Sequence, residues 1–94
     1  MEIKHSKTTF GGEFAAFIDN EQAGLISYLN EAGGVMALEH TEVDDRFRGQ
    51  SVGKIILLEI VDFARKNGLK IKPVCPFIVS MFKRYEDIRD VLQD

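Results

Sequence analysis

The chain has 94 residues, of which 45% are hydrophobic and 29% are charged, and its formal net charge is −3. This length and composition predict one soluble domain with a modest core, spanning residues 1–94. The acidic balance argues against nucleic acid as the main partner, because backbone phosphates are usually bound by a basic surface.

A single cysteine excludes an internal disulfide, and the two histidines with that cysteine, at unrelated spacings, give no ligand set for a metal. The chain contains neither the apolar block of a signal peptide nor an apolar run long enough to cross a bilayer. We therefore expect a cytoplasmic protein with no membrane partner and no metal.

The first third of the chain predicts an antiparallel sheet. Short runs with alternating or β-favouring residues are separated by glycines and by Asn and Asp residues, which is typical of a meander of hairpins. The expected strands are Met1–His5, Glu13–Asp19 and Gln22–Leu29. Met1–His5 can pair at an edge of this sheet, although the pattern does not fix that pairing.

Val35–Asp44 is the next predicted strand. Its alternation places His40 on the same face as Met36 and Leu38. From about Ser51 to Asn67 the apolar residues recur at helical spacing, and Gly68 is a suitable C-terminal stop.

Leu69–Val74 follows the predicted helix as a further strand. A strand, helix and strand of this size imply parallel pairing with a right-handed crossover. Pro73 cannot donate a ladder hydrogen bond, so one edge of the strand is unpaired near its end or turns away from its neighbour. A splayed pair of parallel strands satisfies this condition. The resulting wedge beside the helix N-terminus offers free backbone groups to a ligand.

Two short helices are expected at the end of the chain, over Phe77–Arg84 and Glu86–Leu92. Pro76 is favourable at a first helical position, because its missing N–H would have no partner there in any case. Cys75 then lies at or next to a helix N-terminus, where the dipole lowers the pKa of a thiol. The alternative interpretation of Cys75 is a small buried hydrophobic residue.

The loop before the long helix predicts an anion site. The N–H groups of a first helical turn have no partners, the helix dipole is positive there, and Arg48 and Lys54 add charge. The spacing is not that of a P-loop, since three residues separate Gly49 from Gly53 and Ile55 follows the lysine. A dinucleotide fingerprint is absent as well. The alternative is an ordinary strand–helix connection capped by the residue before the helix, Ser51.

The run Arg48-Gly49-Gln50-Ser51-Val52-Gly53 resembles the acetyl-CoA loop of the GNAT superfamily of N-acetyltransferases. That loop reads Arg/Gln-x-x-Gly-x-Gly/Ala at the start of a helix, and Ser51 stands where the first family glycine is expected. Together with His40-Thr41-x-Val43 and Pro73-Val74-Cys75-Pro76-Phe77, the run looks like a compact subfamily of small GNAT-like proteins that lack the superfamily's usual first helices.

The resemblance implies a truncated GNAT fold of the α/β (α+β) class. It has a mixed, largely antiparallel central sheet, a splayed parallel strand pair and flanking helices. The long helix is expected on one face of the sheet, and the short helices are expected to close the other end. The pantetheine arm of acetyl-CoA, the implied cosubstrate, would lie in the wedge between the splayed strands. The implied cofactor-binding residues are Thr41, Val43, Arg48, Gly49, Gln50, Ser51, Val52, Gly53 and Lys54.

The resemblance also implies direct attack of an amine on the acetyl thioester, which needs a base and an acid. His40, titratable near neutral pH, is the candidate base, directly or through a water; its alternative is a packed histidine beside apolar neighbours. Cys75 is the candidate acid for the departing thiolate. It could instead accept the acetyl group itself, a route we rank lower. Tyr85 is a weaker candidate acid.

We therefore expect an acetyl-CoA-dependent N-acetyltransferase with an unidentified amine acceptor. Larger members use helices after the first strand to wall the acceptor site, and this chain has no room for them between His5 and Glu13. An open site suits a bulky acceptor such as a protein side chain or terminus. The alternatives are a non-catalytic acyl-CoA-binding or regulatory module and, more weakly, an interaction domain that binds another anion. Four acidic residues near the strand end are interpreted as a solvated strand end, with attraction of a cationic amine as the alternative: Glu39, Glu42, Asp44 and Asp45.

Overall fold

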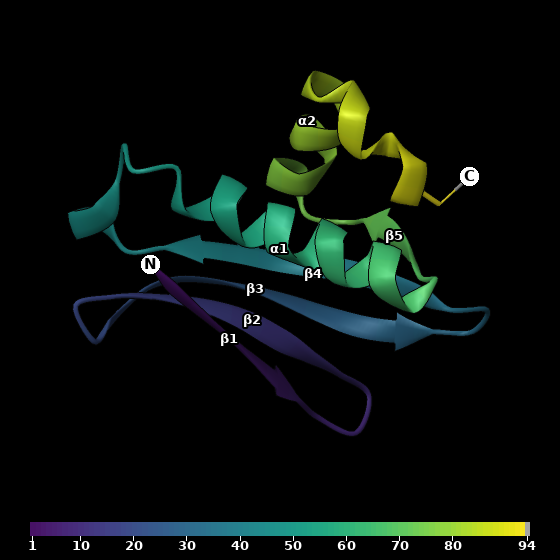
Figure 1. Ribbon diagram of the computed structural model, residues 1–94, viewed down its shortest axis with the longest axis horizontal. Coiled ribbons are helices and arrows are strands. Elements are labelled where there is room, and N and C mark those ends of the chain that lie inside the picture. The colour runs from purple at the N-terminus through teal and green to yellow at the C-terminus, as the bar shows by residue number, and fades with distance from the viewer. Residues whose placement is uncertain (94) are drawn as a thin grey trace.

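Five strands form one sheet in the order β1-β2-β3-β4-β5, in a computed structural model that describes residues 1–93 (Figure 1). The first four run antiparallel to their neighbours in a meander, and β5 pairs with β4 in parallel. Their bounds are β1 (Glu2–Lys7), β2 (Gly11–Ile18), β3 (Glu21–Glu31), β4 (Val35–Val43) and β5 (Lys70–Pro73). This mixed sheet with flanking helices confirms the predicted fold class.

The long helix α1 (Val52–Asn67) lies across one face of the sheet and completes the core (Figure 1). Its buried side chains, including Ile56 and Ile60, pack against apolar residues of the strands such as Ile26 and Leu38. Gly68 ends the helix in the left-handed conformation, with φ of 64°, and donates its N–H to the carbonyl of Ala64. The helix therefore begins and ends within one residue of the predicted bounds.

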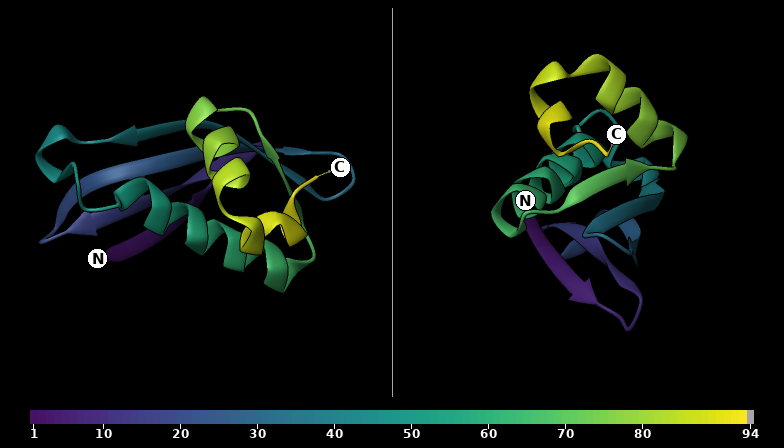
Figure 2. Two further views of the ribbon diagram at one scale, coloured as in Figure 1. Left: turned by 90° about the horizontal axis from the view of Figure 1, so that it is seen from above. Right: turned by 90° about the vertical axis from the view of Figure 1, so that its right-hand side faces the viewer.

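The short helices gather beside β5 rather than over the remaining face of the sheet (Figure 2). They are α2 (Pro76–Arg84) and a 3-10 helix, η2 (Glu86–Val91), at the positions of the two predicted short helices. After η2, Gln93 donates its N–H to the carbonyl of Ile71, so the end of the described chain covers the outer edge of β5. No helix within residues 1–93 has the length and apolar character of a membrane span.

A β-bulge in β4 reverses the side of the sheet on which its residues lie. Ser27 of β3 pairs with His40, but the next residue, Tyr28, pairs with Leu38, so Glu39 is an extra residue on β4. Beyond the bulge, Val43 packs on the core and His40 is exposed. The expectation that His40 shares a face with Met36 and Leu38 is therefore wrong, because simple alternation fails at the inserted residue.

The parallel pair β4 and β5 separates as predicted. Pairing runs only from Val35 opposite Lys70 to Leu38 opposite Pro73. The N–H groups of Val74 and Cys75 both donate to the carbonyl of Leu38, at 3.2 and 3.1 Å, and the chain then turns into α2. The second half of β4 thus has no partner strand on this side within the described part of the chain.

Candidate functional site

The loop that follows β4 is held by Arg46. A short 3-10 turn, η1 (Asp45–Phe47), begins after Asp44, whose carboxylate accepts the backbone N–H of Arg46 at 2.9 Å and its guanidinium at 3.1 Å. The same guanidinium binds Glu21 of β3 at 2.8 Å. The hydrogen bonds from the Arg46 side chain and backbone lower the pKa of Asp44. The loop is therefore tied back to the sheet.

Two residues of the loop adopt the left-handed conformation just before α1. Gly49 has φ of 82°, and Ser51 has φ of 58° and ψ of 32°. Ser51 is the N-cap of α1 by position, but its side chain makes no capping hydrogen bond. The alternative reading of an ordinary connection capped by Ser51 is therefore not supported. The positive φ also explains why a glycine suits this position in the family pattern.

The first turn of α1 leaves three donors available. The first backbone hydrogen bond of this turn runs from Ile55 to the carbonyl of Ser51, at 2.9 Å. The N–H groups of Val52, Gly53 and Lys54 have no acceptor among the described residues. The turn carries no acidic residue, although Asp or Glu would stabilise it, and it carries a lysine instead. This arrangement favours an external anion.

A cavity of about 620 Å³ opens at this helix N-terminus and reaches the unpaired end of β4. It brings together all but one of the predicted cofactor residues, since Gln50 is exposed and is not among the lining residues. The predicted residues that line the cavity are Thr41, Val43, Arg48, Gly49, Ser51, Val52, Gly53 and Lys54. Of these, Arg48 also forms a salt bridge with Asp45 at 2.9 Å.

The rest of the cavity lining comes from α2, with Tyr85 at its end, and from η1. Phe47, Phe77, Met81 and Arg84 were not predicted as site residues, and Tyr85 was considered only as an acid. The sequence did contain a pattern that could have indicated the residues from α2, because positions 77, 81, 84 and 85 fall on one face of a helix.

Gly53 makes the approach of α2 possible. A Cβ atom on Gly53 would lie 2.8 Å from the ring of Phe77, closer than real contacts allow. The glycine therefore serves helix packing rather than backbone conformation, since its φ is not positive.

Cys75 is the N-cap residue of α2, and Pro76 begins the helix as predicted. The Sγ atom lies 3.5 Å from the hydroxyl oxygen of Thr41, which lines the cavity. Partial burial raises the pKa of the Cys75 thiol. Hydrogen bonds from the Thr41 hydroxyl and from the backbone N–H groups of Phe77 and Ile78 outweigh burial, so that its pKa lies below the ordinary value. The sulfur thus lies beside the cavity with a stabilised thiolate form.

His40 lies elsewhere. Its side chain is 60% exposed, and Nε2 is 3.1 Å from Oε1 of Glu42, which is similarly exposed. His40 is not among the residues that line the cavity, and the bulge turns it to the face of β4 opposite Thr41. Neither candidate catalytic residue is among the residues that line the cavity, but Cys75 contacts Thr41, which does line it, whereas His40 lies on the other face of β4.

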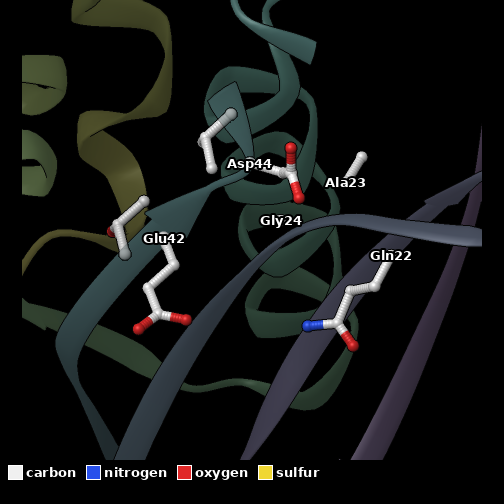
Figure 3. Close-up of a pocket in the computed structure, with 7 residues that line it drawn as sticks. Gln22, Ala23, Gly24, Glu42 and Asp44 are labelled. Atoms are coloured by element: carbon white, nitrogen blue, oxygen red, sulfur yellow. The ribbon is translucent and has the colours of Figure 1, made fainter. Parts of the chain in front are cut away.

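A second hollow, of about 490 Å³, lies where β3 begins and β4 ends (Figure 3). The carboxylates of Glu42 and Asp44 and the amide of Gln22 line it, and it shares Thr41 and Val43 with the first cavity. Two of the acidic residues noted in the sequence are thus brought together. Each already has a partner, since Glu42 binds His40 and Asp44 binds Arg46.

A family model and a solved structure relate this chain to the same group of proteins. A family model described as GCN5-related N-acetyl-transferase matches residues 13–91. The solution structure of a GCN5-like protein from Staphylococcus aureus is 31% identical, with a TM-score of 0.77, over 98% of this chain and 87% of that chain. No curated protein sequence gives a significant match.

Two more distant structures share the fold alone. A ribosomal-protein-alanine N-acetyltransferase from Brucella melitensis biovar Abortus is 14% identical, with a TM-score of 0.71, over 83% of this chain and 64% of that chain. An aminoglycoside N-acetyltransferase solved in complex with CoA is 18% identical, with a TM-score of 0.59, over 86% of this chain and 68% of that chain. The family match over most of the sequence confirms the resemblance noted in the loop, and the chain belongs to the GCN5-related N-acetyltransferase family.

Proposed function

We propose that this protein is an acetyl-CoA-dependent N-acetyltransferase that transfers the acetyl group to an amine. The observation that carries the proposal is the cavity in which the free N–H groups at the start of α1 meet the unpaired end of β4. Membership of the family and the CoA complex of a structural neighbour support it.

Each part of the cavity suits a different part of acetyl-CoA. The N–H groups of Val52, Gly53 and Lys54, with the Arg48 guanidinium, suit the diphosphate. The free edge of β4 at Thr41 and Val43 suits the amide groups of the pantetheine arm, as an added strand would. Gln50, Gly49 and Ser51 shape the loop, and the Ser51 hydroxyl is available as a further donor.

The chemical step needs one proton removed and one supplied. The acceptor nitrogen forms a bond to the thioester carbonyl carbon, and the bond from that carbon to sulfur breaks. We assign Cys75, in its thiol form, as the acid that protonates the departing CoA sulfur, because its Sγ lies beside Thr41 and a thiol with a lowered pKa gives up its proton more readily. Transient acetylation of Cys75 is the second route, and the same position supports it.

We assign His40 as the base that takes the proton of the acceptor amine. Because His40 lies on the outer face of β4, this role requires the amine to approach from that face, past Glu42. The exposed carboxylate of Glu42 in this hollow would then attract a cationic amine, whereas Asp44 is already paired with Arg46. The strands β1 and β2 are joined by a short turn with no helix over this approach, which suits a bulky acceptor such as a peptide.

The first test is calorimetric titration with acetyl-CoA and with CoA, followed by intact mass measurement after incubation with acetyl-CoA. Binding with an added acetyl group that is lost in Cys75→Ala supports the acetyl-cysteine route. Binding without an adduct supports direct transfer or the rival function, a non-catalytic acyl-CoA-binding module. Absence of binding contradicts the proposal.

Measurements of turnover separate direct acetyl transfer from the non-catalytic module. CoA release is followed with a panel of amines and peptides, for the unchanged protein and for Cys75→Ala and His40→Ala. Each substitution should leave acetyl-CoA affinity nearly unchanged and slow turnover by roughly 10²–10⁴-fold, the usual contribution of a general acid or base. Acetyl-CoA binding with no acceptor-dependent CoA release favours the non-catalytic module.

A further inference from the structure

At one end of the cavity lie side chains that the proposed function has not assigned to any part of acetyl-CoA. Lys54 from the first turn of α1 and Arg84 and Tyr85 from the end of α2 line it. Cys75 lies at the other end of α2, about 14 Å away along the axis, because a helix rises by about 1.5 Å per residue. The cavity therefore extends from Thr41, which contacts Cys75, to a cationic end at Lys54 and Arg84, as an elongated ligand would require.

The two cations at this end are held by one aromatic ring. The Nζ atom of Lys54 lies 4.5 Å from the centroid of the Tyr85 ring, and the guanidinium carbon of Arg84 lies 5.4 Å from it. Such contacts position a cation without neutralising its charge. Neither cation lies within 4.0 Å of a carboxylate in residues 1–93, whereas Arg46 and Arg65 each pair with one. Positive charge is thus concentrated and unpaired at the cavity wall.

CoA carries a third phosphate that its diphosphate and pantetheine sites leave unbound. With the diphosphate at the start of α1 and the thioester near Cys75, this 3′-phosphate on the ribose is the remaining anionic group. A guanidinium can bind a phosphate through two parallel hydrogen bonds.

We propose that Arg84, with Lys54 beside it and Tyr85 positioning both, binds the 3′-phosphate and selects CoA over 3′-dephospho-CoA. This inference rests on the proposed function, because it assumes that CoA occupies the cavity. It adds a specificity determinant at the end of α2, outside the loop.

Calorimetric titration with CoA and with 3′-dephospho-CoA tests the assignment. We expect the unchanged protein to bind CoA at least about tenfold more tightly, and Arg84→Gln to lose about tenfold in CoA affinity. Affinity for 3′-dephospho-CoA should stay within about twofold, because that ligand lacks the group that Arg84 contacts. Arg84→Lys, which keeps the charge, should retain much of the preference.

Lys83→Gln is the matched control. It removes the same charge from the neighbouring position on α2, but Lys83 is exposed and does not line the cavity. The affinities of Lys83→Gln for CoA and for 3′-dephospho-CoA should therefore equal those of the unchanged protein. Equal binding of both nucleotides by the unchanged protein overturns the assignment, as does an equal loss for both in Arg84→Gln or a similar loss in Lys83→Gln. Failure of both nucleotides to bind overturns the proposed function as well.

Discussion

Ser51 has a left-handed backbone conformation that is unfavourable for stability. A non-glycine residue with φ of 58° is sterically disfavoured, and the side chain makes no capping bond in return. Ser51→Gly should therefore raise the free energy of unfolding by about 1 kcal/mol or less, since relief of strain is partly offset by the greater entropy of the unfolded chain. Urea unfolding at an unchanged m-value measures it.

Gly49→Ala is the matched comparison, because it imposes the same kind of strain in the opposite direction. Gly49 has φ of 82° and open space where a Cβ would lie, so only the backbone is tested. We expect a loss of about 1 kcal/mol. A destabilising Ser51→Gly, with Gly49→Ala neutral, would show that the loop conformation is not set by these two residues.

The edge strand β1 is anchored by one residue that packs against three other elements. The His5 ring is stacked on Phe14 of β2 at 4.0 Å and meets the edge of Phe63 of α1 at 4.9 Å. Its Nε2 lies 2.5 Å from the hydroxyl of Tyr28 on β3. Burial, and then the nearby charge of Lys7, lower the pKa of His5 below 6.5. The neutral ring is therefore the form that the fold favours.

This contact predicts a pH dependence of stability. Below 6.5 the unfolded chain binds a proton at His5 before the folded protein does, so stability falls as pH decreases from 6.5 through the lowered pKa. His5→Phe removes this titration and also removes the partner of the Tyr28 hydroxyl. At about pH 7.5 the variant should therefore have a lower melting temperature than the unchanged protein. At about pH 5 the difference between the two proteins should be smaller, because only the unchanged protein loses stability through His5; a difference that does not change with pH would contradict the prediction.

The contact between α1 and α2 depends on Gly53 and Phe77. A methyl group at position 53 would lie 2.8 Å from the Phe77 ring, so Gly53→Ala must displace that ring and the cavity wall it forms. Alanine otherwise favours a helix over glycine by about 0.5–1 kcal/mol. With Phe77 present, Gly53→Ala should not gain this stability, because the new methyl group displaces the ring. In a Phe77→Ala background, Gly53→Ala should raise the free energy of unfolding by that amount.

A double-mutant cycle measures this coupling by denaturant unfolding of the four proteins. The coupling energy should be about 1 kcal/mol or more, as for other residues in direct contact. Additive effects would mean that the two helices adjust without cost. Acetyl-CoA affinity, measured on the same proteins, should fall in Gly53→Ala even if stability is little changed.

Across the whole molecule, local patterns were sufficient to predict most elements. The helical spacing ending at Gly68 predicted α1 within one residue at each end, and Pro73 predicted where β4 and β5 separate. Both features depend on residues close together in the chain. The loop from Arg48 to Lys54 was recognisable for the same reason.

Features that depend on pairing between distant segments were not predictable. The bulge at Glu39 arises from the register of β4 against β3, and it moves His40 to the outer face. The wall formed by Met81 and Arg84 depends on how α2 folds back toward α1.

Ser51 looked like a helix cap by residue type, but its backbone conformation leaves the side chain without that bond.

Because the cavity is built from β4, the loop, α1 and α2 together, it exists only in the folded protein. Acetyl-CoA at about 100 times its dissociation constant should then stabilise the whole domain by about 2.7 kcal/mol, or roughly 11–22 °C in melting temperature for this size. Arg48→Ala should reduce the shift by about 4 °C, since Arg48 is exposed and shared with Asp45. Lys66→Ala, which breaks only the salt bridge with Asp62, should keep the full shift. An equal shift in Arg48→Ala and Lys66→Ala would place the bound nucleotide away from the loop.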